Sequence, residues 1–226
     1  METHFQQELN KLKENLLKMA GLAEQAISNA VEALVQRNMS LAEKTIKEDE
    51  KINQMEILID EWCLKLLALY QPMAADLRFI TSAMRINIEL ERIGDLAVNI
   101  AERVIFLNQE PQLKPYIDIP RMAEITQAMV KDVLDAFVNG DTNLARAVCE
   151  RDDQVDALND QVFRELLTYM MADPKTITRA VHLIIVSRCL ERIADHTTNI
   201  AEGIIFMVKA LVIKHHADAK AEETKK

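Results

Sequence analysis

The chain has 226 residues, of which 49% are hydrophobic and only 4% aromatic, with four glycines and five prolines. Ala, Leu, Ile, Met, Glu and Lys dominate the composition, which predicts a nearly all-helical protein. The net charge of −9 argues against a nucleic-acid-binding protein, because such proteins need a basic surface.

Apolar positions recur at helical spacing along nearly the whole chain. In the first half the expected helices are Phe5–Gln36, Leu41–Leu69 and Met73–Leu107. In the second half they run from the linker to about Asn139, from Asp141 to about Met171, and from Pro174 to about Val212. The expected breaks are a cap at Asn38 or Ser40, the proline Pro72, the pair Gly140-Asp141, and the pair Asp173-Pro174.

The segment 108–120 contains three of the five prolines and is the clearest linker. Three long helices joined by tight turns form an antiparallel three-helix bundle. The fold class is therefore expected to be all-α, with two tandem, pseudo-repeated three-helix bundles. Their expected extents are residues 1–110 and 111–226, and the second is expected to end in a frayed polar tail.

The cysteines and the two ends of the chain bear on location. Cys63, Cys149 and Cys189 are scattered and lack metal-site spacing, which favours reduced thiols and a cytoplasmic protein. The first sixteen residues are too polar for a secretory signal. The most apolar stretch, 203–213, is too short to span a bilayer. Any membrane association is therefore expected to be peripheral and to occur through partners.

A duplication is visible in the sequence. Residues 90–106 read LERIGDLAVNIAERVIF and residues 190–206 read LERIADHTTNIAEGIIF, with eleven of seventeen positions identical. Upstream the repeat continues at an offset of 103 residues. Such a repeat indicates that one supersecondary unit was duplicated. Because the retained residues include acids, each half is expected to carry the same chemical site.

The retained acids fall on one helix face. At about 100° per residue, Glu91 and Asp95 lie nearly opposite the apolar stripe, which predicts that they reach the surface. Their neighbours Leu96 and Ala97, which become His196 and Thr197 in the second copy, are expected to point outward as well. The candidate metal ligands are Asp49, Glu56, Asp60, Glu91, Asp95, Asp152, Asp156, Glu191 and Asp195. Possible supporting residues are Asn53, Asn99, Glu102, Asn199 and Glu202.

Clustered carboxylates repel one another, and a bound cation removes that penalty. An oxygen-only ligand set suits Mg, Ca, Mn or iron, so a divalent or trivalent ion is expected. The alternative is a solvated acidic face, paired with the stripe Arg85, Arg92 and Arg103. A carboxylate-bridged di-iron enzyme would need Glu-x-x-His motifs, and none of the five histidines has Glu three positions earlier.

The LERIGD and LERIAD blocks, QPMAADLR at 71–78 and NQMEILIDEWC at 53–63 resemble the PhoU family of phosphate-signalling regulators. The resemblance implies two three-helix bundles with surface metal sites at Glu91/Asp95 and Glu191/Asp195, partnered by Asp49, Asp152 and Asp156. The second half has Asn159 and Phe163 where Glu56 and Asp60 would map, which predicts fewer or weaker bound ions there.

The resemblance also implies a function. Such a protein is a negative regulator of the phosphate-starvation response and of phosphate uptake, and it couples a phosphate ABC transporter to a sensor histidine kinase. It is not an enzyme, and it is expected to be a homodimer. The alternative function is a carboxylate-rich metal-binding or storage protein, or a metal-dependent enzyme.

Overall fold

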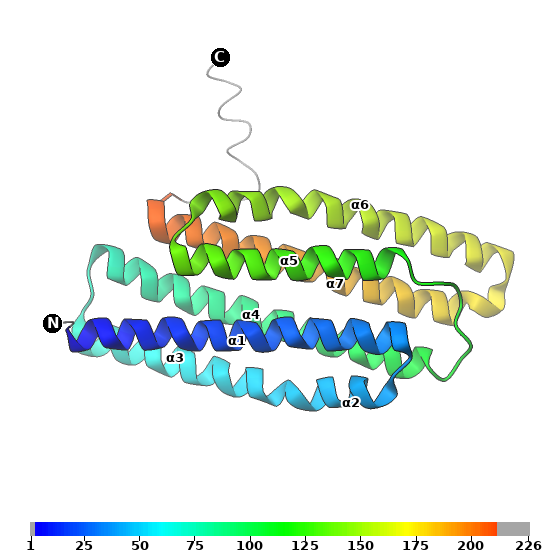
Figure 1. The fold of residues 1–226 in the computed structure, drawn as a ribbon, viewed down its shortest axis with the longest axis horizontal. Helices are drawn as coiled ribbons and strands as arrows, with labels where there is room; N and C mark the ends of the chain where they lie inside the picture. The colour runs from blue at the N-terminus through cyan, green and yellow to red at the C-terminus, as the bar shows by residue number, and fades with distance from the viewer. Residues whose placement is uncertain (1–2, 212–226) are drawn as a thin grey trace, which may run out of the picture.

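The structure, a computed structural model, describes residues 3–211. Within these residues the chain is helical and contains no strand, which confirms the all-α prediction. The elements are α1 (His4–Gln36), α2 (Met39–Glu48), α3 (Glu50–Tyr70), α4 (Ala74–Leu107), α5 (Asp118–Asn139), α6 (Thr142–Ala172), the 3₁₀ turn η1 (Pro174–Thr176) and α7 (Ile177–Lys209). All the helices run along one long axis, with the α3–α4 and α6–α7 turns at opposite ends (Figure 1).

The predicted helix breaks are made by the expected residues. The Asn38 side chain accepts a hydrogen bond from the Leu41 backbone N–H and caps α2. Gly140 ends α5 with φ = +63°, a conformation that glycine adopts without steric cost. Asp141 then caps α6 by accepting hydrogen bonds from two backbone N–H groups. Local side-chain chemistry therefore determines where these helices begin and end.

The expected helix Leu41–Leu69 is instead two helices that meet at Asp49. The Ile52 N–H donates to the Asp49 carbonyl at 2.8 Å, a three-residue bond that tightens the chain at the junction. The equivalent helix of the second half, α6, runs unbroken through Asp152. No proline or glycine stands at the junction, so sequence alone did not indicate it.

Two helix ends also differ from expectation. α7 ends at Lys209 rather than near Val212, because Ala210 takes a left-handed conformation with φ = +54°. α5 begins at Asp118, which places Pro120 in its first turn, where a missing N–H breaks no helical hydrogen bond. The predicted frayed tail lies outside the described residues.

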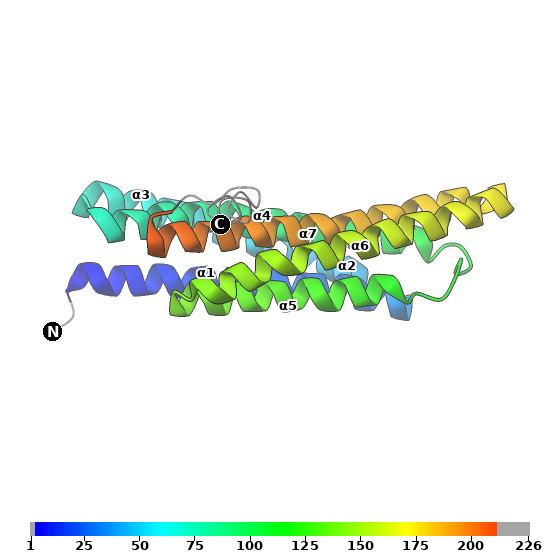
Figure 2. The same cartoon turned by 90° about the horizontal axis from the view of Figure 1, so that it is seen from above.

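The two bundles lie side by side, and their buried side chains form one continuous core. Seen from above, α1 and α5 lie on one side and α4 and α7 on the other (Figure 2). α4 and α7 are antiparallel along their whole length. Contacts that show this register are Arg78 Nε to the Met207 carbonyl (3.2 Å), Ser82 Oγ to the Gly203 carbonyl (3.5 Å) and Phe106 stacked on His182 (5.0 Å between ring centroids). The prediction of two tandem pseudo-repeated bundles is confirmed, while the boundary near residue 110 stays a prediction.

The α4–α7 contact corrects one sequence inference. Leu96, Ala97, His196 and Thr197 were expected to point outward, but all four are buried. They are covered because α4 and α7 pack against each other. Each of these helices therefore has a second buried face, which an analysis of one helix at a time misses.

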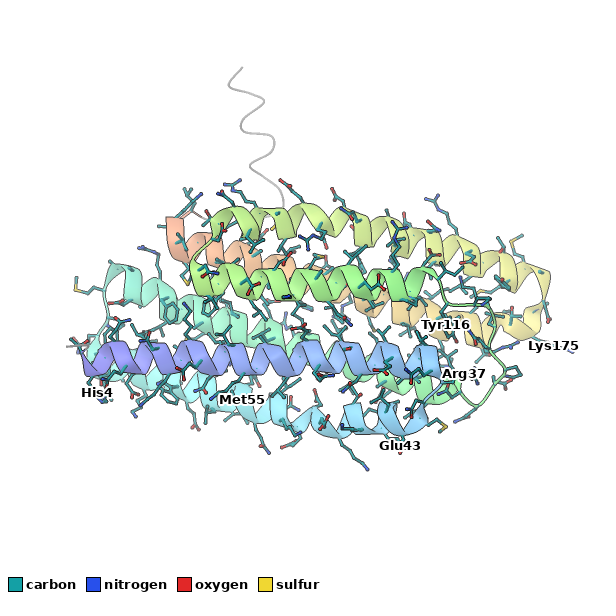
Figure 3. The ribbon with its side chains drawn as sticks, viewed as in Figure 1. His4, Arg37, Glu43, Met55, Tyr116 and Lys175 are labelled. Carbon is teal, nitrogen blue, oxygen red and sulfur yellow. The ribbon has the colours of Figure 1, made fainter. Side chains whose placement is uncertain are left out.

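The linker is fastened to the helices at one end of the molecule. The Arg37 guanidinium donates to the carbonyls of Leu107, Asn108 and Glu110. Tyr116 lies beside Arg37 in Figure 3. No helix among residues 3–211 is both long and apolar enough to cross a membrane.

Candidate metal centre

The first acidic cluster lies where the α2–α3 junction meets α4. Glu91 and Asp95 come from α4, Glu56 from α3, and Asp49 stands at the junction itself. Gly94 permits this approach, because a Cβ at that position would lie 3.2 Å from Asp49 Oδ1 and 2.9 Å from Ile52 Cδ1. The second half has Ala194 at the same place, so its helices cannot meet in the same way.

The four carboxylates of the first cluster act on one another. Burial, followed by the charge of Asp95, raises the pKa of Asp49, while a hydrogen bond from Asn53 Nδ2 (3.1 Å) works in the opposite direction. Burial and the charges of Asp95, Glu56 and Asp49 raise the pKa of Glu91. Asp49 Oδ1 is buried and has no hydrogen-bond partner among residues 3–211. A cation bound at this place would relieve both the repulsion and the desolvation.

The second acidic cluster is built in the same way from α6 and α7. Asp152 and Asp156 come from α6, and Glu191 and Asp195 come from α7. Burial and the charge of Asp195 raise the pKa of Asp156. Burial and the charges of Asp195 and Asp156 raise the pKa of Glu191. Asp152 is the most buried of the four, with only 8% of its surface exposed.

The structure places Asp60 and two supporting residues of the first half as follows. Asp60 accepts a hydrogen bond from Asn87 Nδ2 at 3.3 Å. At a rise of 1.5 Å per residue it lies roughly 16 Å from Asp49 along the axis of α3, and therefore apart from the first cluster. Asn99 donates to the Asp95 backbone carbonyl, not to its carboxylate. Glu102 pairs with Arg103 at 3.4 Å.

The supporting residues of the second half also take other partners. Asn199 donates to Glu89 Oε2 at 3.2 Å, across the contact between the two halves. Burial and the charges of Glu202 and Asp152 raise the pKa of the Cys149 thiol to about 11, which places Glu202 beside that thiol. Asn53, in contrast, does donate its amide to a cluster carboxylate, that of Asp49.

Comparison with known proteins decides the family. The PhoU domain matches this chain twice, at residues 16–104 and 119–204. The chain belongs to the PhoU family. The phosphate-specific transport system accessory protein PhoU homologue of Aquifex aeolicus is 48% identical to it over 95% of this chain and 98% of that protein. The Pseudomonas putida homologue is 42% identical over 93% of this chain and 83% of that protein.

Solved PhoU structures share the fold. The crystal structure of PhoU from Pseudomonas aeruginosa superposes with a TM-score of 0.89 at 42% identity, over 92% of this chain and all of that one. The phosphate transport system regulatory protein PhoU from Streptococcus pneumoniae superposes with a TM-score of 0.87 at 29% identity, over 94% of this chain and all of that one. The resemblance drawn from the two LERI blocks is thereby confirmed.

The donor set of both clusters fits the hard cation predicted for this PhoU chain. All the candidate ligands are carboxylate oxygens, and the buried Asp49 Oδ1 is a polar atom in need of a partner. In residues 3–211, however, no three His, Cys, Asp or Glu side chains stand close enough to hold a metal ion as they are. Binding of an ion would therefore require these carboxylates to move closer together. The metal sites stay a prediction.

Sequence reasoning missed two residues that shape this region. Gly94 allows the α2–α3 junction to pack against α4. The sequence held a signal for this contact, because the first LERI block has Gly94 where the second has Ala194. Glu89 was also overlooked. Its carboxylate lies within hydrogen-bond distance of His196 Nδ1, at 2.6 Å, and accepts a hydrogen bond from the Asn199 amide. Burial opposes its ionisation, but these two partners outweigh burial and lower its pKa. Its role depends on the packing of α4 against α7, which no local pattern reveals.

Proposed function

We propose that this PhoU chain is a cytoplasmic regulator of phosphate homeostasis. In this proposal it couples a phosphate ABC transporter to a sensor histidine kinase, and it holds the kinase in its repressing state when phosphate is plentiful. The observation that carries the proposal is the double match to the PhoU domain, with relatives named as accessory proteins of phosphate-specific transport. The chain acts as an adaptor and not as an enzyme.

Exposed apolar side chains at equivalent places in the two halves support an adaptor role. Leu64 on α3 and Leu167 on α6 are both exposed, as are Leu77 on α4 and Ile177 on α7. In this proposal these matched positions contact partner proteins. Partner contacts, including those of a homodimer, are the means by which this chain works at the membrane.

Metal ions at the two acidic clusters are part of the proposal. Glu91 and Asp95 with Asp49 and Glu56 would hold one ion or cluster of ions. Glu191, Asp195, Asp152 and Asp156 would hold the other. The ion would supply positive charge to a repelling set of carboxylates and so fix the α2–α3 junction and α6 against their neighbours.

A gene deletion and its rescue test the regulatory role. Deleting the gene should switch on alkaline phosphatase in phosphate-rich medium, and the wild-type gene should restore repression. A deletion strain with normally repressed phosphatase, together with turnover of a substrate by the purified protein, would favour the metal-dependent enzyme.

Metal analysis tests the two clusters together, independently of the regulatory role. The variant Asp95→Asn/Asp195→Asn should lose bound manganese or iron when purified without chelators or nickel resin, while its circular dichroism stays helical. Unchanged metal content in this variant would exclude the assignment and favour solvated acidic faces.

A further inference from the structure

A cavity of about 400 Å³ lies between α1 and the α2–α3 junction. Its polar lining comes from Gln25 and Asn29 on α1, Lys44, Thr45 and Glu48 on α2, and Lys51 on α3. Its apolar lining includes Leu22, Ala26 and Ile52. This volume falls in the range of sites that bind small molecules. In Figure 3 the labelled residues Glu43 on α2 and Met55 on α3 mark the two sides of the junction.

The duplication shows that this cavity is particular to the first half. The α1 sequence aligns with the α5 sequence at the offset of 103, because the paired residues Met19 and Met122, and Ile27 and Val130, are all buried. The residue that corresponds to Ala26 is Met129, which is completely buried.

The polar lining has diverged in the same way. Asn29 and Glu48 correspond to Asp132 and Arg151, which form an ion pair at 2.8 Å. The two lysines correspond to Ala147 and Gln154. The second half therefore fills and neutralises the equivalent place, whereas the first half keeps space, two ammonium groups and a buried amide.

We propose that this cavity binds a phosphate group, either as free inorganic phosphate or as a small phosphomonoester. Two ammonium groups match the charge of a phosphate dianion. The Asn29 side chain, which is nine-tenths buried, supplies an amide donor at the cavity wall. The Thr45 hydroxyl donates to the Leu41 carbonyl at 2.9 Å, so it lines the cavity but leaves the hydrogen bonds to a phosphate to Asn29 and the two lysines. Gln25 Nε2 already donates to Asn29 Oδ1 at 2.8 Å, so the Asn29 amide group points its donors elsewhere.

The negative charge of Glu48 lowers the affinity of this site for anions. Its carboxylate pairs with Lys51 Nζ at 2.9 Å, and this hydrogen bond lowers the pKa of Glu48. The pair holds the lysine near the cavity while the negative charge weakens anion binding. Removing only that charge should therefore strengthen binding.

The cavity also adjoins the acidic cluster. Glu48 is the last residue of α2 and Lys51 lies in the first turn of α3, so a ligand held by Lys44 and Lys51 bridges the junction that carries Asp49. Binding would hold the junction in one arrangement and change the affinity of the acidic cluster for metal, and by linkage the metal would change the affinity for the ligand. This coupling rests on the metal sites proposed above, whereas the binding of the phosphate group does not.

Calorimetric titration of metal-free, full-length protein tests the binding. Inorganic phosphate and ribose 5-phosphate are the two probes, and ribose is the uncharged control. We expect saturable 1:1 binding that weakens at least tenfold in Lys44→Ala/Lys51→Ala and strengthens in Glu48→Gln. Lys47→Ala, which removes an exposed lysine of the same helix outside the cavity lining, is the matched control and should bind as wild type does.

The two probes distinguish the sources of the phosphate group. Tighter binding of ribose 5-phosphate identifies a phosphomonoester, because the cavity has room for an organic group beside Leu22. Equal or tighter binding of inorganic phosphate identifies free phosphate, because the organic group then adds nothing to the affinity, and both results support the site. Absence of saturable binding, or an equal loss in Lys47→Ala, would overturn the proposal.

A cavity-filling variant keeps the test independent of charge. Ala26→Met copies the second half, so it should abolish binding and leave the melting temperature close to that of wild type. Wild-type affinity in Ala26→Met would place the ligand elsewhere and overturn the proposal.

Hydrogen exchange tests the coupling to the junction. Backbone amides 48–53 should exchange more slowly when the phosphate ligand is bound. The ligand should change the affinity of the protein for Mn²⁺, and Mn²⁺ should change the affinity for the ligand by the same factor. Binding without either effect would overturn the coupling. If Ala26→Met lost binding yet restored phosphatase repression in the deletion strain, the regulatory function would stand without this site.

Discussion

The two acidic clusters come from one duplicated unit, yet they hold their carboxylates differently. In the first half Asp49 stands at a helix junction, close to Gly94. In the second half Asp152 lies in an unbroken helix and is more deeply buried. The comparison shows that the aspartate was kept in both halves while the helix around it changed.

The clusters also differ in where an amide replaces a carboxylate. The first half has Asn53 and Glu56, and the second has Asp156 and Asn159 at the equivalent positions. Each cluster therefore keeps four carboxylates, because Asp156 compensates for the missing counterpart of Glu56. The sequence analysis counted Asp152 and Asp156 among the ligands of the second half, but it predicted a weaker second site because Glu56 and Asp60 lack counterparts there. The structure gives a reason to expect two sites of comparable strength.

The largest expected effect comes from removing one charge in each cluster separately. Asp95→Asn and Asp195→Asn should each lower the affinity of one cluster for Mn²⁺ by about 10–100-fold and leave the other unchanged. Inductively coupled plasma mass spectrometry after dialysis against limiting Mn²⁺ measures this. Asp135→Asn, at an exposed carboxylate on α5, is the control. Strongly unequal losses would show that the clusters are not equivalent.

The contact between the halves offers a second comparison. In the antiparallel α4–α7 register, the mirror of the Glu89–His196 pair is Cys189 with Leu96. Glu89→Cys leaves His196 without its carboxylate, so it should destabilise the protein by about 1–3 kcal/mol, or about 2–10 °C in Tm. The double variant Glu89→Cys/His196→Leu copies the apolar mirror pair and should regain most of that loss. Thermal unfolding under reducing conditions measures the Tm of both variants. If the double variant were less stable than Glu89→Cys alone, the expected compensation between the mirror pairs would be contradicted.

Exchanging glycine and alanine between the halves should give unequal results. Ala194→Gly removes a buried methyl group and favours the unfolded chain, so a loss of about 1–2 kcal/mol is expected. Gly94→Ala gains helix propensity but forces Ile52 and Asp49 away, so its net effect should stay within about 1 kcal/mol. Urea unfolding measures both. Equal losses would show that the close approach at Gly94 does not matter for stability.

The smallest effect concerns pH. The pKa values of Glu91 and Glu191 are raised in the folded protein, so both groups stabilise it below their ordinary pKa and lose that contribution as the pH rises through the raised values. In metal-free protein at pH 7, Glu91→Gln and Glu191→Gln should each raise Tm by about 1–3 °C, and this gain should vanish near pH 4. A gain that persisted at pH 4 would point to a cause other than charge.

Much of the fold could be predicted because its signals are local. Asn38, Gly140, Asp141 and Pro174 act on their immediate neighbours, and these breaks occur where the sequence placed them. The helix through Asp49 was predicted incorrectly, because its junction depends on contact with Gly94 of another helix. Local propensity cannot reveal a break whose partner lies 45 residues further along the chain.

By itself the sequence determined the helical class, the duplication, the family and the carboxylates that repeat, since all of these are carried by residue identity and spacing. Only the tertiary structure decided which of those carboxylates meet. Packing of α4 on α7 buried His196 and turned Asn199 toward Glu89, and packing of the α2–α3 junction on Gly94 brought Asp49 toward Glu91 and Asp95. The reason is geometric: a helix with two buried faces has its second face defined by a partner, and that partner is distant in sequence.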